Sequence, residues 1–129
     1  MANFPSLSDS DYAVMQILWR DVEADSSAIS KELYDQFGWS RQTVGTYLKR
    51  LVDKGLVSTK KKNKRDFIYF PAVTKEQYGT DITSSYLNRY FSSLSHMVSG
   101  LMQNEDLSAQ EIENLEKLIQ DYKSQRKGE

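Results

Sequence analysis

Hydrophobic and polar positions alternate with a helical period early in the chain. In the stretch RQTVGTYLKRL, apolar side chains recur three and four residues apart, as in an amphipathic helix with one buried face. This stripe consists of Val44, Tyr47, Leu48, Leu51 and Val52. We predict a helix that is capped by Ser40 and ends at Gly55.

Two further helices are predicted before this one. Ser8 and Asp11 have the spacing of a capping box, which predicts a first helix that runs to Arg20. A second helix should begin after Asp25 and end at Gly38. The side chains expected to face the core are Tyr12, Met15, Ile17, Leu18 and Trp19 in the first helix and Ile29, Leu33 and Phe37 in the second.

The hydrophobic period changes after Gly55. The short runs LVSTK and DFIYF are rich in β-branched and aromatic residues, and KKNKR separates them. They predict one two-stranded hairpin that ends at Pro71, with Asn63 in a left-handed conformation at its turn. We call residues 60–65 the hairpin tip.

The last third of the chain returns to a helical pattern. Thr74 with Gln77 and Ser108 with Glu111 repeat the capping spacing. Between these points, apolar residues step by four and three as in a heptad repeat, and the final helix has a similar stripe. We call this set the C-terminal seam and expect it to form a dimer interface: Leu87, Phe91, Leu94, Val98, Leu101, Ile112, Leu115, Ile119 and Tyr122.

Three helices, with only GWS between the second and third, followed by a hairpin, are the element order of a winged helix-turn-helix. The predicted fold class is mainly α with a small β hairpin. A winged helix-turn-helix domain should occupy residues 1–73, and a helical dimerisation region residues 74–129.

The charge distribution points to a polyanionic partner. Residues 40–75 contain ten Lys and Arg against two Asp, a local charge of +8 in a chain of net charge −1. In the helix-turn-helix geometry the second helix of the pair enters the major groove of double-stranded DNA. We therefore predict that helix 40–54 and the hairpin tip bind DNA.

Individual roles follow from the helical wheel and from side-chain chemistry. We expect base contacts from the first turns of the helix, where Gln suits adenine and Thr can offer either its hydroxyl or its methyl group. Cations and the helix cap should contact phosphates. The predicted base-contacting residues are Arg41, Gln42, Thr43, Gly45 and Thr46, and the predicted phosphate-contacting residues are Ser40, Lys49, Arg50, Lys60, Lys62, Lys64 and Arg65.

Gly45 is unusual because glycine inside a helix costs about 1 kcal/mol relative to alanine. It lies at the border between the apolar stripe and the polar face. A missing side chain there would permit close approach either of DNA or of a neighbouring helix. The sequence leaves both explanations open.

Other function classes have weaker support. The chain has no cysteine, so disulfides and thiolate metal sites are excluded, and we predict neither cofactor nor metal nor catalytic residues. The single histidine, His96, lies among seam residues and is expected to be a partly buried interface residue. No stretch has the length and apolarity of a membrane span or the pattern of a signal peptide, which predicts a cytoplasmic protein without membrane insertion. A winged-helix protein-interaction module remains the alternative.

The stretches LSDSDYAVMQILW, WSRQTVGTYLKRLVDKGLV, FIYFP and LSAQEIENLEKLI resemble the penicillinase-repressor family, which includes copper-responsive members. The resemblance implies a homodimeric repressor that binds palindromic promoter operators, often with TACA/TGTA-like half-sites, and dimerises through its C-terminal helices. Two features depart from the family. The cysteine cluster of the copper-responsive members is absent, and Gly100–Leu101 stands where penicillinase repressors have the Asn-Phe bond cut by a regulatory protease. The inducing signal, whether protease or small molecule, is left open.

Overall fold

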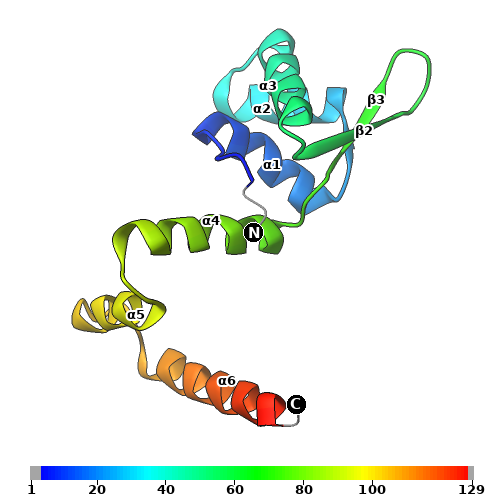
Figure 1. The fold of residues 1–129 in the computed structure, drawn as a ribbon. Helices are drawn as coiled ribbons and strands as arrows, with labels where there is room; N and C mark the ends of the chain where they lie inside the picture. The colour runs from blue at the N-terminus through cyan, green and yellow to red at the C-terminus, as the bar shows by residue number, and fades with distance from the viewer. Residues whose placement is uncertain (1–3, 128–129) are drawn as a thin grey trace. The chain divides into compact units, whose positions relative to one another are not determined.

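The structure is a computed structural model, and it describes residues 4–127. Its elements follow in the order α1 (Asp9–Asp21), β1 (Ala24–Asp25), α2 (Ser26–Phe37), α3 (Arg41–Asp53), β2 (Val57–Lys61), β3 (Phe67–Pro71), α4 (Lys75–Tyr90), α5 (Leu94–Gln103) and α6 (Ala109–Lys127) (Figure 1). The chain divides into two compact units, one up to Ser84 and one from Ser85. Within the described residues, no helix is long and apolar enough to cross a membrane.

The predicted helix ends are confirmed in the first unit. The Ser8 side chain accepts a hydrogen bond from the Asp11 amide, and the Asp11 side chain accepts one from the Ser8 amide, which completes the capping box of α1. The Asp25 and Ser40 side chains cap α2 and α3 by accepting hydrogen bonds from the Ala28 and Thr43 amides, respectively. Gly38 and Gly55 both have positive φ angles, near +75°, which only glycine adopts readily.

The core of the first unit is built from the apolar faces of α1, α2 and α3, closed by the sheet. Figure 1 shows the three helices packed together, with the β2–β3 hairpin extending from them. The apolar helical side chains with no exposed surface are Val14, Met15, Leu18, Ile29, Leu33, Val44 and Leu51. The prediction of a buried position is wrong for two residues, because Tyr12 is 43% exposed and Phe37 is 54% exposed.

The sheet has three strands in the order β1-β3-β2, all antiparallel. The prediction of two strands missed β1, whose two residues pair Ala24 with Tyr69 and Asp25 with Ile68. A strand this short has no alternation from which it could be predicted. It matters for the site because it brings the α1–α2 connection against the hairpin.

The start of α4 belongs to the first unit. The Tyr78 hydroxyl accepts a hydrogen bond from the Leu7 amide, and Asp81 accepts one from the Phe4 amide. Trp19 adds a hydrogen bond from its indole nitrogen to the Val73 carbonyl. These contacts explain why the compact units divide within α4 rather than at residue 73, where we placed the domain boundary.

The second unit contains the C-terminal seam. The first part of the seam, from Leu87 to Leu101, is divided between α4 and α5, whereas its heptad spacing predicted one continuous helix. Helix α4 ends at Tyr90, and Ser93 caps a new helix by accepting a hydrogen bond from the His96 amide. The His96 ring accepts a hydrogen bond from the Ser92 amide and is exposed in the protomer. No described residue of α5 or α6 is fully buried, and Leu94, Ile119 and Tyr122 are more than half exposed.

Candidate nucleic-acid interface

Helix α3 separates an apolar face from a polar face, as its sequence predicted. Val44, Leu48 and Leu51 are buried in the core. The opposite face is exposed and carries Arg41, Gln42, Gly45, Thr46, Lys49 and Arg50. The structure therefore brings the predicted base-contacting residues together on the first turns of one exposed helical face, except that Thr43 is half-buried beside it.

The N-terminal end of α3 is fixed by its cap and by aromatic packing. The Ser40 hydroxyl accepts a hydrogen bond from the Thr43 amide. Trp39 stacks on Phe37 with 4.7 Å between ring centroids and packs against Tyr47 at 5.2 Å. This rigid start holds the first turns of the helix, which a sequence-reading surface requires.

The C-terminal end of α3 is tied to α1 through a buried carboxylate. Asp11 is fully buried, and its Oδ2 atom lies 2.9 Å from Lys54 Nζ, while its Oδ1 atom lies 3.8 Å from Arg50 Nη1. Burial by itself would raise the pKa of the Asp11 carboxyl. Hydrogen bonds from Lys54 and Ser8, with the positive charge of Lys54, outweigh burial and hold this pKa below its ordinary value.

The hairpin tip contains two lysines that already have partners. Lys60 Nζ lies 2.9 Å from Glu23 Oε2, and Lys62 Nζ lies 2.9 Å from Asp25 Oδ2. The hydrogen bond that Lys62 donates to Asp25 raises the pKa of Lys62, and bonds from the Ala28 amide and Lys62 lower the pKa of Asp25. Both acids sit at or beside β1, so these pairs join the hairpin to the α1–α2 connection.

The other cations of the hairpin tip have no such partner. Lys61, Lys64 and Arg65 are exposed, and within residues 4–127 their side chains form no ion pair or hydrogen bond. Asn63 does not adopt the predicted left-handed conformation. Instead its Oδ1 atom accepts hydrogen bonds from the Arg65 and Asp66 amides, which closes the turn through the side chain.

Gly45 is not explained by tight helix packing, and that alternative is wrong. A Cβ atom built on Gly45 would meet nothing within 4 Å. The residue instead borders a cleft of about 230 Å³ between α3 and the sheet, where Thr59, Phe67 and Tyr69 form the facing wall. The space around Gly45 opens to solvent within the described structure.

We expect Gly45→Ala to stabilise the protein. Alanine gains helical propensity worth about 1 kcal/mol in the free energy of unfolding, and its methyl group displaces no neighbour. Denaturant unfolding of wild type and variant measures the difference. A destabilised variant would show that Gly45 has a packing role after all.

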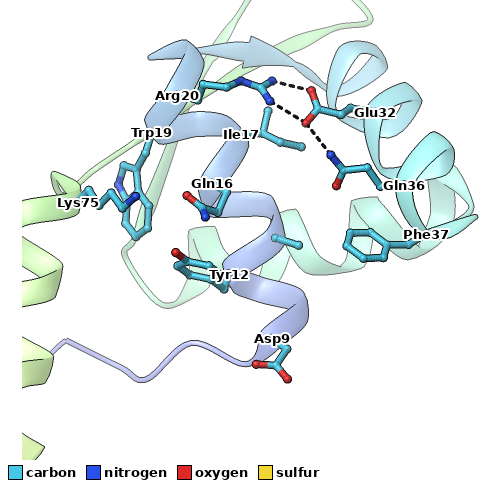
Figure 2. A pocket seen from close by; sticks show the side chains of 11 residues that line it. Asp9, Tyr12, Gln16, Ile17, Trp19, Arg20, Glu32, Gln36, Phe37 and Lys75 are labelled. Atoms are coloured by element: carbon cyan, nitrogen blue, oxygen red, sulfur yellow. Dashed lines mark hydrogen bonds and ion pairs between the residues drawn. The ribbon is translucent and has the colours of Figure 1, made fainter. Parts of the chain in front are cut away.

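A second hollow, of about 760 Å³, lies along α1 and is lined also by α2 and the start of α4. Figure 2 shows Tyr12 and Trp19 on one side and Phe37 on another, with Lys75 at the edge. At one end Arg20 donates two hydrogen bonds to Glu32, at 2.6 and 3.0 Å. The charged groups at this end already satisfy one another, so the hollow offers no reactive group there.

The sequence prediction missed the acidic partners of the hairpin. Glu23 and Asp25 lie far from Lys60 and Lys62 in the chain, and only the short β1–β3 pairing brings them together. The spacing gives only a partial signal: Lys60 and Lys62 lie two residues apart, as side chains on one face of a strand do, but β2 ends at Lys61. The identity of the facing acids could not be read from it.

Comparison with known proteins identifies relatives across nearly the whole chain. A family model described as penicillinase repressor matches residues 7–121. The penicillinase repressor of Bacillus licheniformis is 31% identical over 128 residues, which cover 98% of this chain and 99% of the relative. The methicillin resistance regulatory protein MecI of Staphylococcus aureus strain N315 is 31% identical over 114 residues, with 88% of this chain and 92% of the relative covered.

Solved structures agree with these sequence relatives. The DNA-binding domain of the repressor BlaI is 32% identical, covers 60% of this chain and 94% of its own, and superposes with a TM-score of 0.54. The monomeric form of Bacillus licheniformis BlaI in complex with the blaP half-operator gives the same identity and coverage with a TM-score of 0.52. This chain belongs to the penicillinase repressor family, a family of winged-helix transcriptional repressors and not of enzymes.

Proposed function

We propose that the protein is a homodimeric transcriptional repressor that binds a palindromic operator with TACA/TGTA-like half-sites. Helix α3 enters the major groove, and the hairpin tip follows the adjacent phosphate backbone. One observation carries this proposal: the exposed polar face of α3 is fixed at both ends, and the hairpin tip of the same unit carries three exposed cations without an ion pair or side-chain hydrogen bond within residues 4–127. Because the proposed ligand is an operator in chromosomal DNA, we expect the protein to act in the cytoplasm.

The proposed division of labour follows the chain. Residues 1–73 bind DNA, and residues 74–129 hold two protomers together. The dimer role is supported by the C-terminal seam, which α4, α5 and α6 leave without a fully buried side chain in the protomer. Apolar surface of this extent on one unit is typical of an interface rather than of a solvated helix.

The experiment is selection from a random pool of DNA duplexes. The full-length protein should enrich duplexes with an inverted repeat, and we call the most enriched sequence the selected duplex. Failure to enrich any sequence, with retention of the protein fold by circular dichroism, would contradict the proposal. The alternative hypothesis, a winged-helix protein-interaction module, would then be favoured.

The hairpin tip gives a prediction about salt dependence. We propose that the principal phosphate contacts are Lys61, Lys64 and Arg65. Within residues 4–127 these side chains form no ion pair that would have to break on DNA binding. In a dimer, Lys61→Ala with Lys64→Ala removes four cations, so the slope of log affinity against log salt should become shallower by up to about 3.6. Titration of the selected duplex at several salt concentrations measures this slope.

The matched control is Lys60→Ala with Lys62→Ala, which changes the net charge equally. These lysines pair with Glu23 and Asp25, so we expect the slope to change by about 1 or less. Equal slope changes in both variants would mean that the ion pairs do not determine which lysines contact phosphate. No change in either variant would place the hairpin tip away from the phosphate backbone.

A further inference from the structure

Both threonines in the first turns of α3 form a local hydrogen bond through the hydroxyl group, and Thr46 uses its only hydroxyl hydrogen in that bond. Thr43 Oγ1 lies 3.0 Å from Ser40 Oγ and accepts its hydrogen bond within the cap. Thr46 Oγ1 donates to the Gln42 carbonyl at 3.0 Å. A threonine hydroxyl has one hydrogen, so in this arrangement Thr46 has no donor left for a base.

The hydrogen bond also sets the direction of the Thr46 side chain. With its hydroxyl turned back to the carbonyl one turn earlier, the methyl group is the part of the side chain left for the outer surface. Thr46 is exposed, so this methyl is accessible. The helix therefore presents an apolar group at a position where the residue type alone predicts a hydrogen bond to a base.

Gly45 makes room beside this methyl group. It is exposed, it lacks a side chain, and, apart from its two chain neighbours and the backbone of its own helix, no atom lies within 4 Å of the position that its Cβ would occupy. Its exposed Cα is itself apolar. Gln42 and Lys49 stand one turn away on either side and supply polar groups around this small apolar hollow.

We propose that Gly45 and Thr46 form a seat for the 5-methyl group of a thymine in the major groove. This assignment rests on the proposed DNA-binding function and specifies one element of its sequence reading. The 5-methyl of thymine is the one apolar group that the four bases present in that groove, so an apolar seat distinguishes thymine from the other bases. Thr46 reads sequence through its methyl group and not through its hydroxyl.

The probe is the selected duplex, synthesised with deoxyuridine in place of thymidine at one symmetric pair of positions at a time. Uracil keeps every hydrogen-bonding group of thymine and lacks only the methyl group. At one thymine in each half-site, the wild-type dimer should bind the uracil duplex about fourfold more weakly per half-site, the effect of one methyl group left in water. At the other thymines the change should be less than twofold.

Two variants separate the methyl group from the hydroxyl group, and a third variant is the control. Thr46→Ser keeps the hydroxyl and removes the methyl, so the ratio of thymine to uracil affinity should fall to about one. Thr46→Val keeps a methyl and removes the hydroxyl, so this ratio should be retained. Thr80→Ser makes the same chemical change on α4, at an exposed residue outside the interface, and should alter neither affinity nor ratio.

Two results would overturn the proposal. One is wild-type binding that is insensitive to uracil at every position of a duplex that the protein does select. The other is a ratio that survives Thr46→Ser and is lost in Thr46→Val, which would assign the reading to the hydroxyl group. If the protein selects no duplex at all, the DNA-binding function itself fails, and that outcome is distinguishable from these two.

Discussion

Leu94→Asp should split the dimer and weaken binding to the selected duplex by on the order of 100-fold or more, because a protomer loses the gain from occupying two linked half-sites. Leu94 is the first residue of α5 and is 59% exposed in the protomer. A carboxylate at the first turn of a helix is favourable to the helix itself. The substitution therefore places a charge in the proposed interface without weakening the fold of the protomer.

The matched control is Ser95→Asp. It adds the same charge to the same first turn, one residue away from the C-terminal seam, at another exposed position. Sedimentation equilibrium at micromolar concentration should show a dimer for wild type and for Ser95→Asp, and a monomer for Leu94→Asp. A monomeric wild-type protein, or a Leu94→Asp protein that remains dimeric, would refute the assignment of the interface.

Asp11→Asn should destabilise the first unit by about 2–3 kcal/mol at pH 7, because it removes the charge that faces Lys54 and Arg50 from a buried position. We expect this loss of stability to be smaller than for a completely buried ion pair, because Lys54 is 27% exposed and water partly screens its charge. The measurement is the free energy of unfolding in denaturant. The variant should also loosen the C-terminal end of α3 and so weaken binding to the selected duplex.

The pH dependence has a defined sign. The folded-state pKa of Asp11 lies below its ordinary value of 3.8, so the ionised carboxylate stabilises the protein above that pH. This stabilisation is lost as the pH falls through the lowered pKa. The difference between wild type and Asp11→Asn should therefore be constant from about pH 5 upward and shrink below pH 4. A difference that does not change with pH would mean that packing, and not charge, explains the effect.

The elements that the sequence predicted well are those with local signals. The cap residues Ser8, Asp25 and Ser40, and the glycines that end α2 and α3, act within one turn of the chain, and each was found at its predicted place. The amphipathic stripe of α3 likewise needs only the helical period. Its exposed face, and hence most of the candidate site, follows directly from that period.

The elements that were missed depend on partners distant in the chain or on competing local signals. The strand β1 exists only because β3 is beside it. Phe37 fits the period of α2, yet its ring stacks on Trp39 at the surface. The heptad spacing continues across Phe91 and Leu94, but Ser93 caps a new helix between them, and the cap determines the backbone. The hydrogen bond of Thr46 could not be predicted, because a serine or threonine hydroxyl in a helix can bond either to a backbone carbonyl of the preceding turn or to water, depending on local geometry.

The most direct test of the DNA-reading surface on α3 is the ratio of two affinities of the wild-type protein. One duplex carries the selected sequence, and the other has the same base composition in shuffled order, both at about 0.15 M salt. A sequence-reading dimer should prefer the selected duplex by on the order of 1,000-fold or more, since specific sites are bound that much more tightly than random DNA. Equal affinity for the two duplexes would contradict the reading of α3 as a recognition helix.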